Sequence, residues 1–354
     1  MNDIKQQLKE TLGNINKSSS NKNQIVLKLK TLTPLYTGGV GQQGDQIHPS
    51  NLLGGIRHMS CLVARFLGDT NFENKVWGTA DDGPEPKAKQ IALKWDTSKL
   101  KSVDLPDKIK IDNNKGWFFN SAFEGELTLQ ITKRNIDDKY WNILLISIAI
   151  QIRHGMFGSK DQFGLGVLDL VNPEDFKKFP KLNIPLNEVK DDFLDEKKNL
   201  MNLKRYAFAK VNFRKASSKN SANFNNATKL KLALAMRYNL RNALRSDDSP
   251  KWKKIRHRMF GDLKDKYSSC VNISAAYGDE KNPQMRIMVE LNLNDKNDRS
   301  EVFKRIRDEI GYVDEFIGNN GYKVIPVNTK DWEFGGNKKN ENKVDWLNKL
   351  AGVL

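Results

Sequence analysis

The most constraining feature of this 354-residue sequence is an order of predicted elements that occurs twice. In each half, a segment of alternating apolar residues precedes an amphipathic helical segment, two strand-like segments, a second helix and a closing strand. The elements predicted in the first half are 24–36, 50–68, 90–95, 125–134, 138–155 and 166–171. Those predicted in the second half are 206–214, 226–245, 269–277, 284–294, 298–311 and 322–327. This order predicts an α+β protein with tandem ferredoxin-like (RRM-like) βαββαβ domains and glycine-rich loops.

The composition between and beyond these units predicts the domain boundaries. We expect a polar N-terminal arm over 1–23, a first ferredoxin-like domain over 24–171 and a second over 205–328. Residues 172–204 are rich in Pro, Lys and Asp without a sustained period, which is typical of a linker. The polar stretch 329–354 is a C-terminal tail, either a short amphipathic helix that docks on a partner or a loosely packed terminus.

Two smaller similarities support a duplication. Arg57 and Arg65 lie eight residues apart in the first predicted helix of the first unit, as Arg237 and Arg245 do in the second unit. An aromatic–glycine pair also precedes the second strand of each unit, and these pairs are Trp77–Gly78 and Phe260–Gly261. The first helix of the first unit is expected to begin at Ser50 or Asn51 as its cap.

The charge balance favours a polyanionic partner. The formal net charge is +16, and clustered Lys and Arg attract phosphate chains because they release bound counterions. The alternative is that a Lys- and Asn-rich composition reflects an AT-rich genome.

Several classes of protein are disfavoured by what the sequence contains. Cys61 and Cys270 lie far apart in apolar stretches, as expected for buried thiols in a reducing compartment. The longest apolar run, which begins at Ile143, is too short to span a bilayer, and the first 24 residues contain no signal-peptide hydrophobic region. We therefore expect a cytoplasmic protein that does not bind a membrane, a cofactor or a metal.

A glycine-rich segment follows the first strand. Residues 33–55 contain six glycines, so the backbone there can approach a phosphate closely and present amide groups to it. The spacing matches neither a Walker P-loop nor a Rossmann turn. A flexible hairpin loop is the alternative. Asp45 is the carboxylate of this segment. It could hold a metal or orient a ribose hydroxyl for RNA cleavage, and the alternative is that it stabilises a turn.

A second candidate site is strongly basic. Residues 229–266 contain twelve Lys or Arg and four Asp, and Arg237, Arg241 and Arg245 recur at helical spacing along one face. Aromatic and imidazole rings lie among or beside these charges, at Trp252, His257, Phe260 and Tyr267. Cations that neutralise phosphates, together with rings that stack on bases, are typical of RNA-binding surfaces. A solvated helix face is the alternative.

Three stretches in the same order resemble the RAMP superfamily of CRISPR effector proteins. They are TLTPLYTGG after the first strand, NLLGGIRHMSCLVARFL as a helix and FGSKDQFGLGVLDL as a glycine-rich loop that enters a strand. The sequence is most similar to the two-domain RAMP subunit of type III-B (Cmr) complexes, and the similarity covers most of residues 24–327. The resemblance implies tandem RRM-like domains that bind CRISPR RNA or its duplex with the target.

The resemblance and the basic block together give the expected RNA-binding residues. The resemblance places an RNA groove along the first strand end, the first helix and the loop 155–166. The residues expected to bind RNA are Tyr36, Thr37, Gly38, Gly39, Arg57, His58, Arg65, Arg153, His154, Gly158, Ser159, Lys160, Phe163, Gly164, Arg237, Arg241, Arg245, Arg256, Arg258 and Lys264. The family's helix often carries aromatic residues after its Arg, whereas this chain has His58 and Met59 there.

The leading functional hypothesis is a non-catalytic RNA-binding subunit of a type III-B CRISPR-Cas ribonucleoprotein in antiviral defence. Its expected partners are CRISPR RNA, target RNA and other RAMP subunits. One alternative is an endoribonuclease, which cuts target RNA through Asp45 or precursor guide RNA through His48, His58 or His154. Another alternative is a purely structural subunit whose basic faces meet acidic proteins.

Overall fold

The structure is a computed structural model, in which most of the chain is described. The described residues are 23–38, 46–79, 88–105, 109–110, 116–117, 121–159, 164–185, 188–189, 201–215, 224–245, 249–261, 268–310, 322–325, 332–335 and 340–353. We call residues 23–189 the first half and residues 201–335 the second half.

The first half is built on an antiparallel sheet. The sheet order is β2-β6-β1-β7, with a further strand, β3, paired to β6. Its strands are β1 (Gln24–Thr31), β2 (Ile91–Asp96), β3 (Leu100–Asp104), β6 (Ser121–Lys133) and β7 (Leu168–Leu170), and β4 (Ile109–Lys110) pairs separately with β5 (Gly116–Trp117). The helices of this half are α2 (Pro49–Phe66), α3 (Phe72–Val76), α4 (Asp138–His154) and the 3-10 helix η3 (Pro173–Lys178).

The second half has a sheet of the same pattern. The order is β11-β8-β10-β9, with β12 also paired to β8, and the described pairings are antiparallel. The strands are β8 (Tyr206–Lys215), β9 (Val271–Ile273), β10 (Gln284–Glu290), β11 (Tyr322–Ile325) and β12 (Glu333–Phe334). The helices are η5 (Leu203–Arg205), α5 (Asn226–Ala243), α6 (Pro250–Phe260), α7 (Lys296–Glu309) and, after this half, α9 (Asn340–Ala351).

Local sequence explains where these elements form. In β1, Leu27 and Leu29 are fully buried, while Lys28 and Lys30 on the opposite face are exposed. Helix α2 has Pro49 in its first turn and is followed by Gly68, whose φ of 84° favours glycine. The expected cap at Ser50 or Asn51 is wrong, because His48 occupies the N-cap position and both other residues lie inside the helix.

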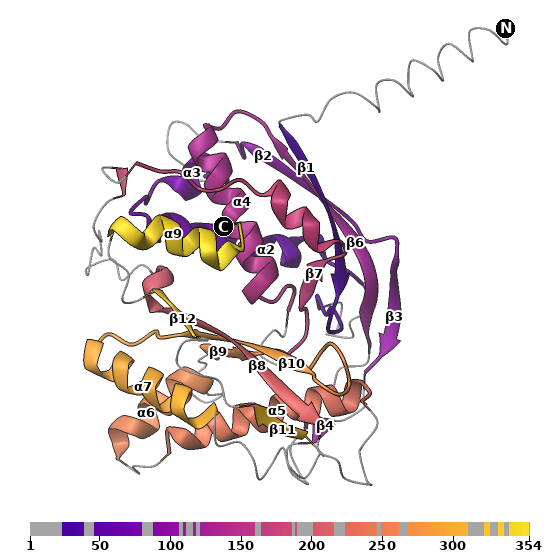
Figure 1. Ribbon diagram of the computed structural model, residues 1–354, viewed down its shortest axis with the longest axis vertical. Coiled ribbons are helices and arrows are strands. Elements are labelled where there is room, and N and C mark those ends of the chain that lie inside the picture. Colours follow the sequence, from indigo (N-terminus) through magenta and orange to yellow (C-terminus); the bar gives the residue numbers. More distant parts are fainter. Residues whose placement is uncertain are drawn as a thin grey trace, which may run out of the picture.

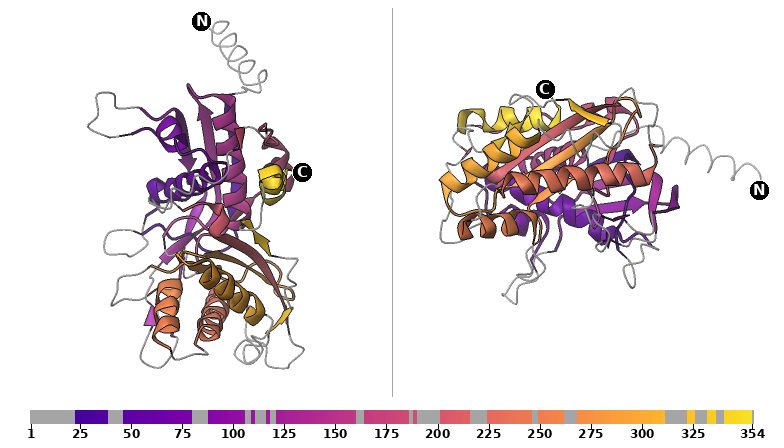
Figure 2. Two further views of the ribbon diagram at one scale, coloured as in Figure 1. Left: turned by 90° about the vertical axis from the view of Figure 1, so that its left-hand side faces the viewer. Right: turned by 90° about the horizontal axis from the view of Figure 1, so that it is seen from below.

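In Figure 1 the first sheet lies to the right of α2 and α4, and the second sheet lies below these helices, with α5, α6 and α7 beneath it; Figure 2 shows the same two halves from other sides. The first sheet packs on α2 and α4, the core around these helices takes in Tyr206 and Phe208 from one face of the second sheet, and α5, α6 and α7 cover its other face. Along β8, Tyr206 and Phe208 belong to the core of the first half, whereas the alternate residues, Val211 among them, belong to the core of the second. The part of the second sheet's face that carries Tyr206 and Phe208 is therefore covered by the first half, whereas Lys210 and Arg214, further along the same face of β8, are exposed.

Helix α9 returns to the first half and packs along α4. The rings of Trp346 and Phe66 lie 5.2 Å apart, and Leu347 and Leu350 are buried in the same core. Asn348 accepts a hydrogen bond from the Leu182 amide at 2.7 Å and donates one to its carbonyl at 2.9 Å, which fixes part of the predicted linker. The tail thus docks on its own chain, an outcome that neither sequence interpretation included.

The predicted α+β class is confirmed, and the described strand pairings are antiparallel. Gly78 and Gly261, of the two aromatic–glycine pairs, both have positive φ, 79° and 82°, and each lies between a helix and the next strand. Except for Asn23, the predicted N-terminal arm lies outside the described residues.

Candidate nucleic-acid interface

Two of the segments predicted to bind RNA lie against each other. The Ser159 amide donates a hydrogen bond of 2.7 Å to the Tyr36 carbonyl. Asn51 of α2 donates from its side-chain amide to the Ser159 hydroxyl at 3.1 Å and also to the Thr37 carbonyl. The structure therefore brings together the loop after β1 and the loop after α4, and Asn51, which the sequence suggested only as a cap, joins them.

Glycines in these loops permit close backbone approach. Gly158 has a φ of +87°, and a Cβ there would lie 2.4 Å from the Tyr36 carbonyl oxygen. Gly164 has a φ of +91°, and a Cβ there would lie 2.3 Å from the amide nitrogen of Ala275 in the second half. Both positions therefore require glycine for packing within the chain. Gly38 also has a positive φ, of 91°.

Several predicted residues of these loops lie outside the described residues. They are Gly39, Asp45, Lys160 and Phe163, and Lys264 of the basic block is a further one.

The side chains of Tyr36 and Thr37 face the interior. Each residue is only 1% exposed. The Thr37 hydroxyl donates to the Gln46 carbonyl at 2.9 Å and accepts from the His48 amide at 2.9 Å. These bonds hold the chain on either side of the 39–45 segment against the start of α2, which is a positioning role.

The predicted cations of α2 share one carboxylate. Arg57, whose side chain is 52% exposed, lies 2.8 Å from Glu73, and the less exposed Arg65 lies 3.3 Å from the other oxygen of Glu73. Neighbouring His58 contacts the Tyr206 hydroxyl at 3.2 Å, and that hydroxyl donates to Glu290 at 2.9 Å. Glu73, which sequence reasoning missed, therefore offsets much of the positive charge on this helix.

Arg153 and His154, at the end of α4, lie at the boundary between the halves. The His154 ring packs on Phe208 with centroids 5.3 Å apart, and its Nε2 donates to the Leu350 carbonyl at 2.9 Å. Burial, together with nearby Lys210, Arg286 and Arg153, lowers the pKa of His154 to about 3, so the ring is neutral at physiological pH. Arg153 lines a pocket that is described below.

In the basic block, Arg237 supports the fold of the second half. Its guanidinium donates to the Phe260 carbonyl at 2.7 Å and to the Val271 carbonyl at 2.9 Å. These contacts tie α5 to the end of α6 and to β9. Its two predicted companions, Arg241 and Arg245, are exposed.

One exposed face of α5 carries three cations and an aromatic ring. Lys231, Tyr238 and Arg241 lie on this helix, and Arg245 follows its last turn. The Tyr238 ring is 44% exposed, whereas Trp252 stacks under Arg305 at 3.9 Å and Phe260 is buried. We call Lys231, Tyr238, Arg241 and Arg245 the α5 face. Sequence reasoning overlooked Tyr238, although its spacing from Arg241 and Arg245 places it on their face.

The remaining predicted cations lie on α6. Arg256 and Arg258 are partly exposed, and Arg258 donates to the Asn292 side chain at 3.3 Å.

The described residues offer little for nucleophilic or metal chemistry. Burial raises the pKa of the Cys61 thiol to about 11 and that of Cys270 to about 12, which disfavours the reactive thiolate. Across the described ranges, no three His, Cys, Asp or Glu side chains come together to hold a metal ion. Nor does any helix in the described part of the chain combine the length and apolar character needed to cross a membrane.

Comparison with known proteins gives matches in structure only. No protein-family model matches the sequence, and the search of curated proteins found no match. The crystal structure of Cmr1 from Pyrococcus furiosus in its apo form is 12% identical, with a TM-score of 0.37 over 75% of this chain and 87% of that chain.

Two further similar chains come from cryo-EM structures of type III-B Cmr-beta bound to cognate target RNA. The first, with AMPPnP and in the presence of ssDNA, is 13% identical, with a TM-score of 0.48 over 82% of this chain and 99% of that chain. The second is 12% identical, with a TM-score of 0.39 over 93% of this chain and 100% of that chain.

Proposed function

We propose that this protein is an RNA-binding subunit of a type III CRISPR effector ribonucleoprotein, built from two ferredoxin-like units. The strand order of each sheet supports the assignment of both halves to that fold. The observation that carries RNA binding is the α5 face, where the exposed Tyr238 ring lies among Lys231, Arg241 and Arg245. CRISPR RNA or its duplex with the target is the proposed ligand.

The chemistry of the α5 face suits an RNA backbone with accessible bases. Lys and Arg neutralise successive phosphates, and an exposed aromatic ring offers a platform on which a base stacks. The second sheet is a poorer candidate near Tyr206 and Phe208, because the first half covers that part of its face. RNA recognition in the second half therefore uses its outer helix layer.

The test is RNA binding by the full chain, measured by fluorescence anisotropy with a labelled single-stranded RNA at several salt concentrations. Replacing both Arg241 and Arg245 by Ala should weaken binding and make the log–log salt slope shallower by about 1.4, at about 0.7 per lost phosphate contact. Arg237 is left intact because its guanidinium holds α6 and β9 in place.

A matched control removes two exposed cations elsewhere. Lys28 and Lys30 lie on the outer face of β1, where Lys30 pairs in register with Glu126 and Asp169. Replacing both by Ala changes the net charge equally and should leave the affinity within about twofold. Equal RNA affinity and salt slope in the two folded double variants would remove the α5 face from the proposal.

Stacking is tested separately at Tyr238. Tyr238→Ala should raise the Kd for single-stranded RNA at least about fivefold, because a base–aromatic stack contributes about 1–3 kcal/mol, whereas Tyr238→Phe should bind like the unchanged protein. Membership of an effector complex is tested by purifying the protein from its host and identifying the associated RNA and proteins. Repeat-derived RNA and other RAMP subunits are the expected companions.

A further inference from the structure

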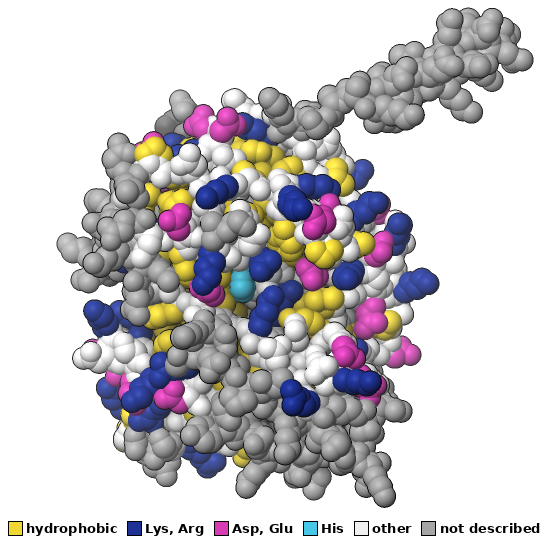
Figure 3. Space-filling model, in the orientation of Figure 1, with side chains coloured by type: hydrophobic (Ala, Val, Ile, Leu, Met, Phe, Trp, Pro, Cys, Tyr) yellow, Lys and Arg dark blue, Asp and Glu magenta, His cyan; other side chains and the backbone are white. Residues whose placement is uncertain are grey.

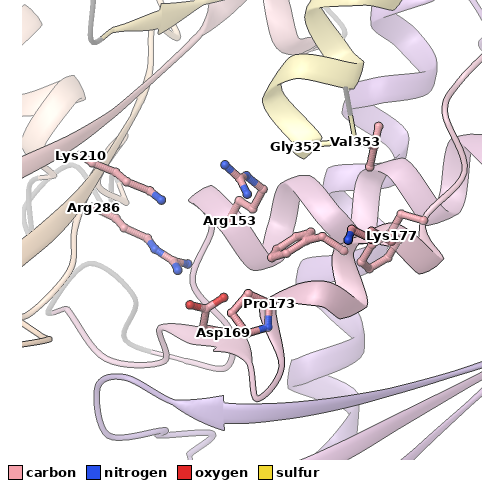
Figure 4. A pocket seen from close by; sticks show the side chains of 10 residues that line it. Arg153, Asp169, Pro173, Lys177, Lys210, Arg286, Gly352 and Val353 are labelled. Atoms are coloured by element: carbon pink, nitrogen blue, oxygen red, sulfur yellow. The ribbon is translucent and has the colours of Figure 1, made fainter.

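A pocket of about 600 Å³ lies at the boundary between the two halves. Its walls come from six places in the sequence: the end of α4, β7, η3, the paired strands β8 and β10, and the residues after α9 (Figure 4). Its charged residues are Arg153, Asp169, Lys177, Lys210 and Arg286. Figure 3 shows Lys and Arg side chains gathered near the middle of the face that it draws.

Two of these cations are forced together by strand register. Lys210 of β8 and Arg286 of β10 are direct partners in the antiparallel ladder, so their side chains leave the same face side by side. Like charges directly opposite each other destabilise a sheet. Lys210 occupies the same face of β8 as Tyr206 and Phe208, just beyond the part that the first half covers.

Arg153 approaches this pair from the first half. Figure 4 shows its side chain in the space between Lys210, Arg286 and the η3 helix. Its guanidinium lies 5.1 Å from the centre of the Phe176 ring, and its buried Nε has no hydrogen-bond acceptor among the described residues. Gly352 leaves room for it, because a Cβ at that position would lie 2.5 Å from Arg153 Nη1.

The positive charge of this cluster is only partly compensated inside the protein. Arg286 donates from Nη1 to the Ile152 and Gly155 carbonyls and from Nε to the Tyr277 hydroxyl, which leaves Nη2 without an acceptor among the described residues. Asp169, the carboxylate of the pocket, is not within 4.0 Å of any of the three cationic groups. Lys177 is already paired with Glu174.

The size and walls of the pocket indicate what kind of anion would fit. A volume of about 600 Å³ is typical of small-molecule sites and far exceeds that of a single phosphate ion. Beside the cations, Pro173, Phe176, Phe179 and Val353 give an apolar and partly aromatic wall. Cations next to such a wall suit a phosphate joined to a flat, poorly hydrated ring.

We propose that this pocket binds a nucleotide, whose phosphate is held by Arg153, Lys210 and Arg286 and whose base lies toward the apolar wall. The phosphate supplies the counter-charge that the cluster lacks. Either a free nucleotide or the terminal nucleotide of an RNA provides this chemistry. The proposal does not depend on the α5 face, which lies on the other side of the second sheet.

The test is titration calorimetry of the full chain with AMP, adenosine and inorganic phosphate. AMP should bind more tightly than either of the others, because only AMP engages both the cations and the apolar wall. Lys210→Ala should weaken AMP binding about tenfold or more, the range expected for loss of a charge-assisted hydrogen bond. Lys210 makes no hydrogen bond to a described residue, so this variant should keep its fold, which circular dichroism checks.

Arg214→Ala is the matched control. Arg214 lies four residues further along β8, exposed on the same face as Lys210, and the pocket does not include it. This variant should bind AMP within about twofold of the unchanged protein. The proposal would be overturned if AMP did not bind, or if AMP bound no more tightly than adenosine or inorganic phosphate. It would also be overturned if Lys210→Ala bound AMP as tightly as the unchanged protein.

Short RNAs with either a 5′-phosphate or a 5′-hydroxyl distinguish the two sources. A preference for the phosphorylated end that Lys210→Ala abolishes assigns the pocket to an RNA terminus. AMP binding without such a preference assigns it to a free nucleotide. The Arg241→Ala/Arg245→Ala variant should bind AMP normally, so failure of this proposal and failure of RNA binding at α5 are separate results.

Discussion

The charge of Lys210 depends on burial and on its neighbours in the pocket. Part of its side chain is exposed, yet its ammonium lies in the recess that it shares with Arg153 and Arg286. Desolvation, followed by the charges of Arg286 and Arg153, lowers the pKa of Lys210 to about 8, and Asp169 opposes this shift. Among the described residues, Lys177 also lines the pocket, and the neutral ring of His154 lies close to Lys210. An anion in the pocket favours the protonated amine.

We therefore predict that AMP binding weakens as the pH rises. Protonated Lys210 predominates below about pH 8, so the affinity for AMP should be greatest there. Above that pH the affinity for AMP should fall by up to about tenfold per pH unit. Lys210→Arg stays charged at these pH values, so its affinity should remain flat. Calorimetry from pH 7 to 9 provides the measurement, and the same decline in both proteins would contradict this role for Lys210.

Replacing two glycines by alanine should have opposite effects on the stability of the protein. Gly54 lies exposed inside α2, and a Cβ there would meet nothing within 4 Å, so Gly54→Ala should stabilise the protein by about 0.5–1 kcal/mol through helix propensity. Gly158→Ala should destabilise it by more than about 1 kcal/mol, because of its positive φ and the nearby Tyr36 carbonyl. Urea unfolding measures both changes, and destabilisation by Gly54→Ala would contradict the helix argument.

Helix α9 is predicted to contribute to the core of the first half. Leu347 is fully buried there, so Leu347→Ala should lower the free energy of unfolding by about 2–5 kcal/mol. Asp345→Ala, an exposed position on the same helix, should change it by less than about 0.5 kcal/mol. Similar unfolding midpoints for the two variants would show that α9 does not pack as described.

Sequence patterns predicted most elements because their apolar periodicity is strong, as in β1 and α2. Strand β9 is shorter than predicted. The Ser274 hydroxyl accepts a hydrogen bond from the Arg286 amide, and the Ala275 amide donates to the Gly164 carbonyl in the other half, so the strand ladder ends there. Helix α6 was overlooked, although Ser249 caps it and Pro250 follows in its first turn, a readable start signal.

The candidate site was less predictable, because it depends on contacts between distant segments. Glu73 lies sixteen residues from Arg57, and nothing in the linear sequence pairs them. The register that places Lys210 opposite Arg286 likewise follows only from the paired strands.

At the scale of the whole molecule, the halves share a buried boundary. Tyr206 and Phe208 of β8 pack into the first core, and the Ala275 amide donates to Gly164 across the boundary. Separating the halves would expose these aromatic side chains and leave backbone groups without partners. The two sheets therefore depend on each other for stability.

We accordingly predict that the described parts of both halves unfold in one cooperative transition. Tryptophan fluorescence and far-ultraviolet circular dichroism should give coincident urea curves, which is the usual evidence for two-state behaviour. Phe208→Ala should lower the common midpoint, since removal of a buried Phe costs about 3–5 kcal/mol. Two well-separated transitions in the unchanged protein would contradict a shared boundary.

The return of α9 to the first half also affects the order of events during synthesis. The ribosome makes all of the second half between α4 and the helix that packs along α4. While the second half emerges, the nascent first half therefore presents to the cell the apolar surface that Trp346, Leu347 and Leu350 later cover. Chaperones that bind apolar segments can bind this surface until α9 has left the exit tunnel. The first half completes its packing only then.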